Sequence, residues 1–457
     1  MLQRAFRVAI IGSGPSGFYL AEELFKVGAG HAPPLHITVD MFEKLPVPYG
    51  LVRYGVAPDH PKIKNVTKVF EKTAQNPHFT FLGHVTVGKD ITVPELQKFY
   101  DALIFAVGAE ADRHLGIEGE GLAGSYTATE FVAWYNSHPD FQDHHFDLSH
   151  DVAVIVGQGN VAMDVARILC KSADELKKTD ISRQALEVLA ESRIREVHMY
   201  GRRGPVQAAF TPPEIREMGE LADCYPVLDP QDLKLNEASQ KEMEDPAHAA
   251  RKKNFEILQH FTTLQPQGRK RKFVLHFFKS PVALLGQGRV QRVKFEMNRL
   301  VGDPGRQKVS GTDKFEEIDC GIFFRSVGYR GIPIKGLPFS DQAGIIPNQN
   351  GRVMDPGKAL AGLYAAGWIK RGATGVIGTN KPDSEDTVKS LLEDLDRLKP
   401  CERPSTQEVI AFLKEKQVRV VTFADWKKID AAEIARGAKS DKPREKFDRV
   451  TGMLSAI

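Results

Sequence analysis

Short apolar runs followed by stretches with helical periodicity recur along this chain. Residues 8–11 form a continuous apolar run, and residues 16–27 carry apolar side chains at helical spacing. The same order returns later in the chain. Residues 151–157 correspond to the apolar run, and the stretch VAMDVARIL, a few residues further on, has the helical spacing. Continuous apolar runs are typical of strands buried in a parallel sheet, and the helices between them supply the crossovers. The pattern therefore predicts an α/β protein.

A glycine-rich turn joins the first predicted strand to its helix. Gly12, Gly14 and Gly17 give the spacing G-x-G-x-x-G, and the next predicted strand, residues 37–42, ends at Glu43. Glycines here let backbone N–H groups and the helix N-terminus approach a pyrophosphate, and the carboxylate can accept hydrogen bonds from both ribose hydroxyls. A glycine-rich turn without a ligand is the alternative. The strand, helix and acid together favour a dinucleotide site.

The second strand–turn–helix unit differs at one informative place. Gly157, Gly159 and Ala162 give G-x-G-x-x-A, but the following predicted strand leads to Arg202 and Arg203 instead of an acid. Paired arginines can hold a 2′-phosphate through forked, charge-assisted hydrogen bonds. A solvated surface arginine pair is the alternative. We predict that the first site prefers an unphosphorylated adenosine ribose and that the second prefers NADP.

The remaining periodic segments are less regular. Residues 45–66 combine several prolines with many apolar side chains, which predicts an ordered, irregular segment lying over a flat surface. We expect a helix at 66–74 and strands at 79–82, 84–87 and 101–108. The last of these strands ends in glycine, which commonly marks the end of a dinucleotide-binding half.

The second half of the chain continues the alternation and then becomes more polar. Strands are expected at 273–278, 290–296, 321–327 and 363–366, and helices at 128–136, 236–244, 406–416 and 431–438. Trp368 stands where many flavoproteins have an acid. No chemistry can be assigned to the polar region after residue 400 from its sequence.

Composition limits the classes of function. The formal net charge of the 457 residues is +3, with 42% hydrophobic and 26% charged residues, as in ordinary globular proteins. The basic residues are scattered, which argues against a nucleic-acid partner, and no apolar run approaches the ~18 residues of a membrane helix. The first predicted strand begins so near the initial Met that no signal peptide is expected.

The cysteines and one histidine-rich tract bear on metal and redox chemistry. Cys170, Cys224, Cys320 and Cys401 are far apart in the sequence and form no C-x-x-C motif. A dithiol centre and a cysteine-held iron–sulfur cluster are therefore not expected, and free thiols fit a reducing compartment. The tract HPDFQDHHF could hold a metal, but a polar surface loop is favoured because no helical histidine pair fixes a geometry.

Five stretches together resemble one family: GSGPSGFY, PYGLVRYGVAPDHPKIKNV, GQGNVAMDVARIL, GRRGPVQAAFT and AGWIKRGATGVIGTNK. They resemble the adrenodoxin-reductase-like ferredoxin–NADP reductases, and the actinobacterial members look closest. Segments 48–66 and 366–381 are specific to this family. The resemblance implies two Rossmann-like dinucleotide-binding domains, in which an FAD domain is split in sequence around an inserted NADP domain. The expected bounds are 1–108 and 331–457 for the FAD domain, the latter with a C-terminal extension, and 109–330 for the NADP domain.

The resemblance also implies site residues. FAD contacts carry over to Gly12, Gly14, Ser16, Gly17, Glu43, Leu51, Val85, Gly367, Trp368, Gly375, Val376 and Ile377. NADP contacts carry over to Gly157, Gln158, Gly159, Asn160, Val161, Arg202, Arg203, Glu214 and Gly375. The paired polar groups near the flavin and nicotinamide look like His60 and Asp164, and no metal is implied.

A basic run gives the expected partner surface. The family's patch for an acidic iron–sulfur ferredoxin falls near Arg251, Lys252 and Lys253, although the order of bases here departs from the family's pattern. A second run, residues 269–272, is the weaker candidate. A solvated face is the ordinary reason for such runs and remains the alternative for both.

By this resemblance the protein is an FAD-dependent NADPH–ferredoxin oxidoreductase, in which hydride passes from NADPH to FAD and single electrons pass on to a ferredoxin. Two other interpretations stay open: a flavin oxidoreductase resembling the small subunit of glutamate synthase, and a module that senses NADP without turnover. The former normally brings cysteine-ligated clusters, which are absent here. We expect a monomer with no nucleic-acid partner and no membrane span, in the cytoplasm or, in a eukaryote, the mitochondrial matrix.

Overall fold

The computed structural model describes residues 5–31 and 35–457. The chain folds as two units: unit 1 extends to Arg113 and resumes at Gly328, and unit 2 runs from His114 to Val327. The boundaries expected from the sequence, after residues 108 and 330, fall a few residues away. In unit 1, β5 (Ala111–Asp112) pairs antiparallel with β15 (Tyr329–Arg330), so the outgoing and returning segments are joined beyond the expected boundary.

Unit 1 is built on a seven-stranded sheet in the order β16-β17-β18-β4-β1-β2-β3, of which β18 to β3 are parallel. Val8 and Ile10 face one hydrophobic core and Ala9 and Ile11 face another, so β1 is buried on both sides. The strands are β1 (Phe6–Ile11), β2 (Ile37–Glu43), β3 (Phe79–Gly83), β4 (Ala102–Phe105), β16 (Asn348–Gln349), β17 (Arg352–Asp355) and β18 (Lys358–Ala365).

The strand expected at 84–87 is wrong. His84 has a φ of 61°, which turns the chain out of the extended conformation directly after β3. The backbone N–H of Val85 then donates to the carbonyl of Glu43, so these residues close over the end of β2 and form no further strand.

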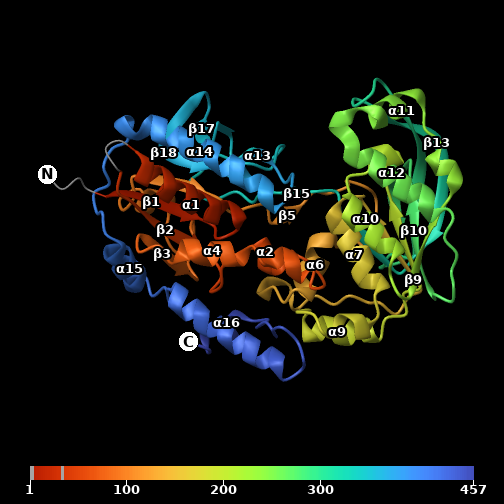
Figure 1. Cartoon of the computed structure of the whole chain (residues 1–457), viewed down its shortest axis with the longest axis horizontal. Helices are drawn as coiled ribbons and strands as arrows, with labels where there is room; N and C mark the ends of the chain where they lie inside the picture. The colour runs from red at the N-terminus through yellow and green to blue at the C-terminus, as the bar shows by residue number, and fades with distance from the viewer. Residues whose placement is uncertain (1–4, 32–34) are drawn as a thin grey trace. The chain divides into compact units, whose positions relative to one another are not determined.

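Helices cover both faces of the sheet in unit 1 (Figure 1), and α14 packs against α1. The helix expected at 431–438 is the end of a longer one, α16, which starts at the Thr422 capping box. The helices are α1 (Pro15–Gly30), α2 (Leu51–Tyr54), α3 (Pro61–Lys64), α4 (Thr67–Ala74), α5 (Val93–Leu96), α13 (Trp368–Arg371), α14 (Asn380–Asp394), α15 (Thr406–Glu415), α16 (Phe423–Ala438) and α17 (Val450–Leu454).

Unit 2 has its own parallel sheet, in the order β6-β14-β7-β8-β10-β9. Its strands are β6 (Ser125–Thr127), β7 (Val152–Val156), β8 (Glu196–Tyr200), β9 (Cys224–Leu228), β10 (Arg271–His276) and β14 (Ile322–Arg325). Its helices are α6 (Ala128–Tyr135), α7 (Asn160–Cys170), α8 (Ala173–Leu176), α9 (Arg183–Ala190), α10 (Pro212–Gly219), α11 (Glu237–Glu244) and α12 (Ala249–Phe261).

A second, antiparallel sheet in unit 2 is formed by β11 (Lys279–Leu285), β12 (Arg292–Val301) and β13 (Lys308–Asp319). Only its middle strand was expected from the sequence, at 290–296. β13 alternates between exposed and half-buried positions, so it lacks the apolar run by which the other strands are recognised. Polar edge strands of this kind are stabilised by their neighbours more than by their own composition.

The cysteines that are far apart in the sequence are not all apart in the fold. All four are free and buried, and burial together with the neighbouring Cys224 raises the pKa of the Cys170 thiol well above its usual value. A thiol with a raised pKa is a poor nucleophile and a poor redox centre. Cys170 and Cys224 are thus neighbours in the fold although they are far apart in the sequence, and the environment of the Cys170 thiol does not favour its reactivity.

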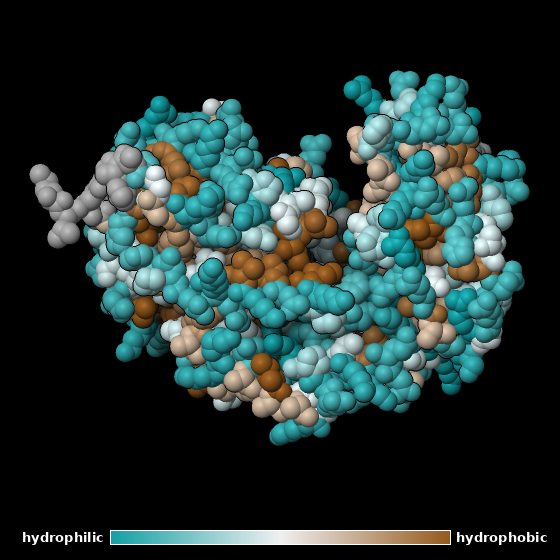
Figure 2. Space-filling model, viewed as in Figure 1, coloured by the Kyte–Doolittle hydropathy of each residue, from teal (hydrophilic) through white to brown (hydrophobic). Residues whose placement is uncertain are grey.

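The surface in view is mostly hydrophilic, with hydrophobic residues gathered near the position of α2 (Figure 2). Large exposed hydrophobic side chains in this part of unit 1 are Leu51 on α2, Ile63 on α3 and Val69 on α4. Among the described helices, none is both long enough and apolar enough to span a bilayer.

Candidate active site

The turn between β1 and α1 forms a cradle for an anion. Gly12 has a φ of 107°, and a Cβ there would lie 2.5 Å from the carbonyl oxygen of Ala106. A Cβ on Gly17 would lie 2.2 Å from the carbonyl oxygen of Gly12, so both positions require glycine. At Gly14, the N-cap of α1, a Cβ would meet nothing within 4 Å, and no side chain caps the helix. The helix N-terminus is therefore open to a phosphate group.

Glu43 lies at the carboxyl end of β2, beside this cradle. Its Oε2 accepts hydrogen bonds from the Ser13 hydroxyl at 2.6 Å and the Ser13 amide at 3.2 Å, and its Oε1 accepts from the Leu45 amide at 3.0 Å. Burial raises the pKa of the Glu43 carboxyl, although these hydrogen bonds oppose the rise. The carboxylate is thus held in one orientation at the strand end.

A polar face of α14 lies against the same cradle, and sequence analysis missed it. The Ser16 hydroxyl donates to Asn380 Oδ1 at 3.0 Å, and the Ser384 hydroxyl donates to the Ser16 carbonyl at 3.2 Å. Asp383 accepts the amide of Gly367 at 2.5 Å. Asn380, Asp383 and Ser384 are buried at helical spacing, and this spacing of polar residues was the available signal.

The other predicted FAD residues in unit 1 divide into buried and exposed. Val85 is buried, whereas Leu51 and Val376 expose 39% and 57% of their surface. Half-buried Trp368 donates its Nε1–H to the carbonyl of Thr374 at 3.0 Å, which fixes the loop before Gly375. Apolar side chains exposed around a cradle are available to contact a flat ring system.

The turn between β7 and α7 repeats the first cradle within unit 2. Gly157 has a φ of 125°, and a Cβ there would lie 2.1 Å from the carbonyl oxygen of Ser326. Gly159, the N-cap of α7, is open like Gly14: a Cβ would meet nothing within 4 Å and no side chain caps the helix. Ala162 is buried where the first turn has glycine. The second helix N-terminus is also suited to an anion.

Residues of the second cradle also position the segment after β8. The backbone carbonyl of Gln158 accepts from the Ala209 amide at 2.9 Å, while its side-chain Nε2 donates to the carbonyl of His276 at the end of β10, at 3.0 Å. Asn160 Oδ1 accepts from the Thr211 amide at 2.9 Å, at the start of α10. Val161, half-buried, packs on the hydrophobic core of the unit.

Arg202 and Arg203 lie directly after β8 with exposed side chains. Asn298 Nδ2 donates to the Arg202 carbonyl at 3.0 Å, and the Phe278 amide donates to the Arg203 carbonyl at 3.0 Å, so their backbone is fixed. Partial desolvation of its guanidinium by the surrounding protein, together with the charge of Arg202, lowers the pKa of Arg203. Two neighbouring guanidinium groups at a strand end are suited to a dianion.

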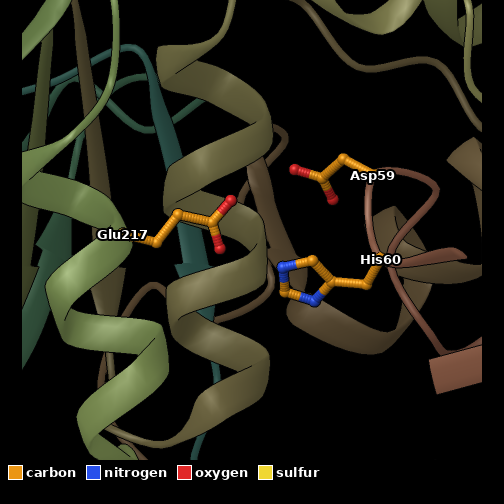
Figure 3. Close-up of side chains that lie close together, drawn as sticks. All are labelled: Asp59, His60 and Glu217. Carbon is orange, nitrogen blue, oxygen red and sulfur yellow. The ribbon is translucent and has the colours of Figure 1, made fainter. Parts of the chain in front are cut away.

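A buried arginine organises the acids of unit 2. Arg167, fully buried on α7, contacts Asp164 at 2.6 Å, Glu214 at 3.2 Å and Glu217 at 3.6 Å. Glu217 lies on α10 (Figure 3), which also carries Glu214. The expected site residues Asp164 and Glu214 therefore share one counter-charge that sequence analysis did not single out, since a lone arginine inside an amphipathic helix gives no signal.

His60 belongs to unit 1. It follows Asp59 at the end of the irregular segment (Figure 3) and is the half-buried residue at the N-cap of α3. Its carbonyl accepts from the Ile63 amide at 3.2 Å, and its own amide donates to the Ala57 carbonyl at 3.1 Å. The backbone at His60 is thus held by a compact pair of turns.

Two open helix N-termini, one followed by a strand-end acid and one by paired arginines, define a dinucleotide-dependent oxidoreductase of the flavoprotein class. A family model described as pyridine nucleotide-disulphide oxidoreductase matches residues 6–216.

Comparison with individual proteins narrows the class. The chain is 45% identical over 98% of its length to the NADPH-ferredoxin reductase FprA of Mycobacterium leprae, covering 97% of that protein. It is 44% identical over 99% of its length to the human mitochondrial NADPH:adrenodoxin oxidoreductase, covering 92% of it. The structure of Mycobacterium tuberculosis FprA in complex with NADPH matches with a TM-score of 0.92 at 44% identity, over 99% of both chains. The chain belongs to this adrenodoxin reductase and FprA family.

Proposed function

We propose that this protein is an FAD-dependent NADPH–ferredoxin reductase. The observation that carries the proposal is the pair of open cradles with opposite strand-end chemistry, Glu43 after one and Arg202 with Arg203 after the other. They occur in a chain that is 45% identical over nearly its whole length to a protein named for this activity.

FAD is assigned to unit 1. The open space at Gly14 and the uncapped N-terminus of α1 fit a pyrophosphate, and the oriented carboxylate of Glu43 fits an unphosphorylated ribose. When bound, FAD supplies an acceptor for two electrons that can release them one at a time. The residues proposed to hold it are Gly12, Gly14, Ser16, Gly17, Glu43, Leu51, Val85, Gly367, Trp368, Gly375, Val376 and Ile377.

NADPH is assigned to unit 2. The open N-terminus of α7 would receive its pyrophosphate, and Arg202 and Arg203 would receive its 2′-phosphate. Asn160 and Gln158 orient the segment that leads to Glu214. The residues proposed to hold the dinucleotide are Gly157, Gln158, Gly159, Asn160, Val161, Arg202, Arg203, Glu214 and Gly375.

His60 and Asp164 are proposed to act beside the reacting rings, on the strength of the family resemblance. Asp164 is oriented by its 2.6 Å contact with buried Arg167, so its carboxylate can hold a proton or a polar ring substituent in a fixed place. His60 carries an imidazole, whose two ring nitrogens can donate and accept hydrogen bonds. A His60→Gln variant should reduce its flavin more slowly in stopped-flow mixing with NADPH while keeping its FAD content. A wild-type rate would remove His60 from the site.

The proposed partner is an acidic iron–sulfur ferredoxin, and the proposed docking charges are Lys252 and Lys253, which are exposed on α12. Arg251 is engaged by Glu242. The weaker run is largely occupied within unit 2, because Lys272 pairs with Glu196 at 2.6 Å and Arg271 donates to the Cys170 carbonyl at 3.1 Å. A monomer in a reducing compartment, cytoplasmic or mitochondrial, completes the proposal.

Anaerobic titration with NADPH, followed through the flavin absorption, tests this function. Bleaching by NADPH, followed by ferredoxin-dependent reduction of cytochrome c, is the expected result. An unbleached flavin would indicate a module that only senses NADP. Bleaching without electron delivery to any ferredoxin would indicate a different flavin oxidoreductase.

A further inference from the structure

Arg251 differs from the two lysines that follow it. Lys252 and Lys253 are exposed on α12, whereas the side chain of Arg251 is half-buried and its Nη1 contacts a carboxylate oxygen of Glu242 on α11. Glu242 is itself buried, with 4% of its surface exposed. The buried carboxylate holds the Arg251 guanidinium in one place. A charge that only attracts a partner through solvent does not need to be held in this way.

The same carboxylate is hydrogen-bonded to the segment that follows Arg202 and Arg203. Glu242 Oε2 accepts from Gln207 Nε2 at 3.0 Å and from the Gly305 amide at 3.2 Å. Gln207 is buried in the short helical turn Pro205–Gln207, which begins two residues after Arg203. Glu242 therefore links Arg251 to the segment that follows β8.

A second bond fixes α12 to the same segment. Asn254 Nδ2, buried one turn after Arg251, donates to the carbonyl of Phe210 at 2.8 Å. Residues 205–210 are thus joined to α12 directly through Asn254 and indirectly through Glu242, which contacts Arg251.

The charges in this corner of unit 2 are unbalanced. Burial and the charge of Arg203 lower the pKa of Arg251, and partial desolvation and the charge of Arg202 lower the pKa of Arg203. Each guanidinium thus raises the cost of charging its neighbour, and Glu242 is the carboxylate that contacts Arg251. Such a cluster is stabilised by a bound anion, and a phosphate monoester carries a charge of about −1.5 to −2 at neutral pH.

We propose that Arg251 is a third guanidinium of the 2′-phosphate site, positioned by Glu242, and therefore a specificity residue for NADPH over NADH. The proposal rests on the proposed function of unit 2. It removes Arg251 from the ferredoxin-docking run and leaves Lys252 and Lys253 there. Arg251 lies on α12, whereas Arg202 and Arg203 follow β8, so Arg251 would add a contact from a second element.

The test uses the full chain with its flavin bound, and compares the affinity for 2′,5′-ADP with that for 5′-AMP. Arg251→Gln should weaken the binding of 2′,5′-ADP about tenfold or more, as expected for the loss of a charge-assisted hydrogen bond. The binding of 5′-AMP should weaken by less than about twofold. Arg251→Lys keeps the charge but loses the paired N–H donors of the guanidinium. Its affinity for 2′,5′-ADP should lie between those of the wild type and Arg251→Gln. Lys241→Gln removes a charge from exposed Lys241, on the same helix as Glu242, and is the matched control with no expected change.

Several outcomes overturn the assignment. Equal weakening of both nucleotides, or none, would make Arg251 a structural partner of Glu242 only. Since Arg251→Gln leaves Glu242 buried beside a neutral side chain, the double variant Glu242→Gln, Arg251→Gln should keep the thermal stability while still losing the 2′,5′-ADP preference. If wild type itself does not prefer 2′,5′-ADP, the NADP assignment of unit 2 fails. If wild type prefers it and Arg203→Ala loses it while Arg251→Gln keeps it, only the role of Arg251 fails.

Discussion

At the scale of single residues, Arg202 and Arg203 should determine which pyridine nucleotide the protein uses. Replacing both by alanine removes two charged partners of a 2′-phosphate, each worth about 1.5–3 kcal/mol as a charge-assisted hydrogen bond. The KM for NADPH is expected to rise far more than that for NADH, with both measured through reduction of ferricyanide. Equal losses for the two nucleotides would show that these side chains do not contact the 2′-phosphate.

Which residues could be found from the sequence depends on whether a local pattern marks them. The glycines at 12 and 157 are recognisable because the turn demands a positive φ close to another strand, a requirement that any sequence with this turn displays. Arg167 and Glu242 carry no such mark. Their roles arise from burial beside residues on other helices, which only tertiary packing reveals.

At the scale of elements, the C-terminal helix α16 is joined to the segment after the first cradle by a buried ion pair. Arg53 on α2 contacts Glu433 on α16 at 2.5 Å, with 5% and 0% of their side chains exposed, and the guanidinium lies 5.1 Å from the centre of the Trp426 ring. The polar C-terminal extension therefore supports α2, the helix that carries the proposed FAD contact Leu51.

Breaking this pair should destabilise unit 1. Glu433→Ala leaves the Arg53 charge buried without its carboxylate, which typically costs about 3–5 kcal/mol, so we expect a lower melting temperature and earlier release of FAD. The double variant Arg53→Met, Glu433→Leu should recover part of the stability because both charges of the buried pair are removed together, although the Phe447 amide still loses its acceptor on Glu433. Lys428→Ala, which breaks an exposed pair with Asp425 on the same helix, is the control. FAD retention and melting unchanged in Glu433→Ala would contradict this role.

A pair of stacked histidines on β8 and β10 gives unit 2 an acid sensitivity. His198 Nδ1 lies 3.0 Å from His276 Nε2, and burial together with Lys279 and His198 lowers the pKa of His276 to about 3. The native state keeps His276 neutral, while the unfolded chain binds a proton below a pKa of about 6.5. The free energy of unfolding should therefore fall as the pH falls from about 6.5 to about 3, by up to ~1.4 kcal/mol per pH unit for one proton.

Replacing His276 should flatten this dependence. His276→Phe keeps a flat ring to stack on Tyr200, whose centre lies 4.2 Å away, and removes the titrating group. Urea unfolding of the variant between pH 7 and pH 5 should show a shallower loss of stability than the wild type. His260→Phe, at an exposed position on α12, is the matched substitution. A slope identical to that of the wild type would place the acid sensitivity elsewhere.

Elements were predictable where composition and period agree. The central parallel strands of the two larger sheets and the helices after the glycine turns stand out, because burial on both faces forces continuous apolar runs, whereas the edge strands β6 and β9 were not expected. The polar face of α14 and the edge strand β13 were missed for opposite reasons. α14 buries polar side chains against the first cradle, and β13 exposes alternate residues at the border of a small sheet.

At the scale of the whole molecule, the proposed function requires a surface at which the ferredoxin binds and receives electrons. An acidic ferredoxin would be steered by exposed positive charge, and steering acts mainly on the rate of association. Lys252 and Lys253 provide such charge because both are exposed. Arg251 differs from them because its guanidinium contacts Glu242. Because the proposed NADPH and FAD sites do not include Lys252 or Lys253, the two half-reactions should be separable experimentally.

Charge reversal of Lys252 and Lys253 to glutamate should lower ferredoxin-dependent reduction of cytochrome c and leave reduction of ferricyanide nearly intact. Because the Debye length shortens from about 10 Å at 0.1 M salt as ionic strength rises, the defect should diminish at higher salt. The matched control reverses Lys177 and Lys241, two lysines of unit 2 that are also exposed. Equal loss with both acceptors would point to misfolding or loss of flavin. A ferredoxin rate that does not change, or a control that falls as far, would show that Lys252 and Lys253 are an ordinary solvated face and that the partner docks elsewhere.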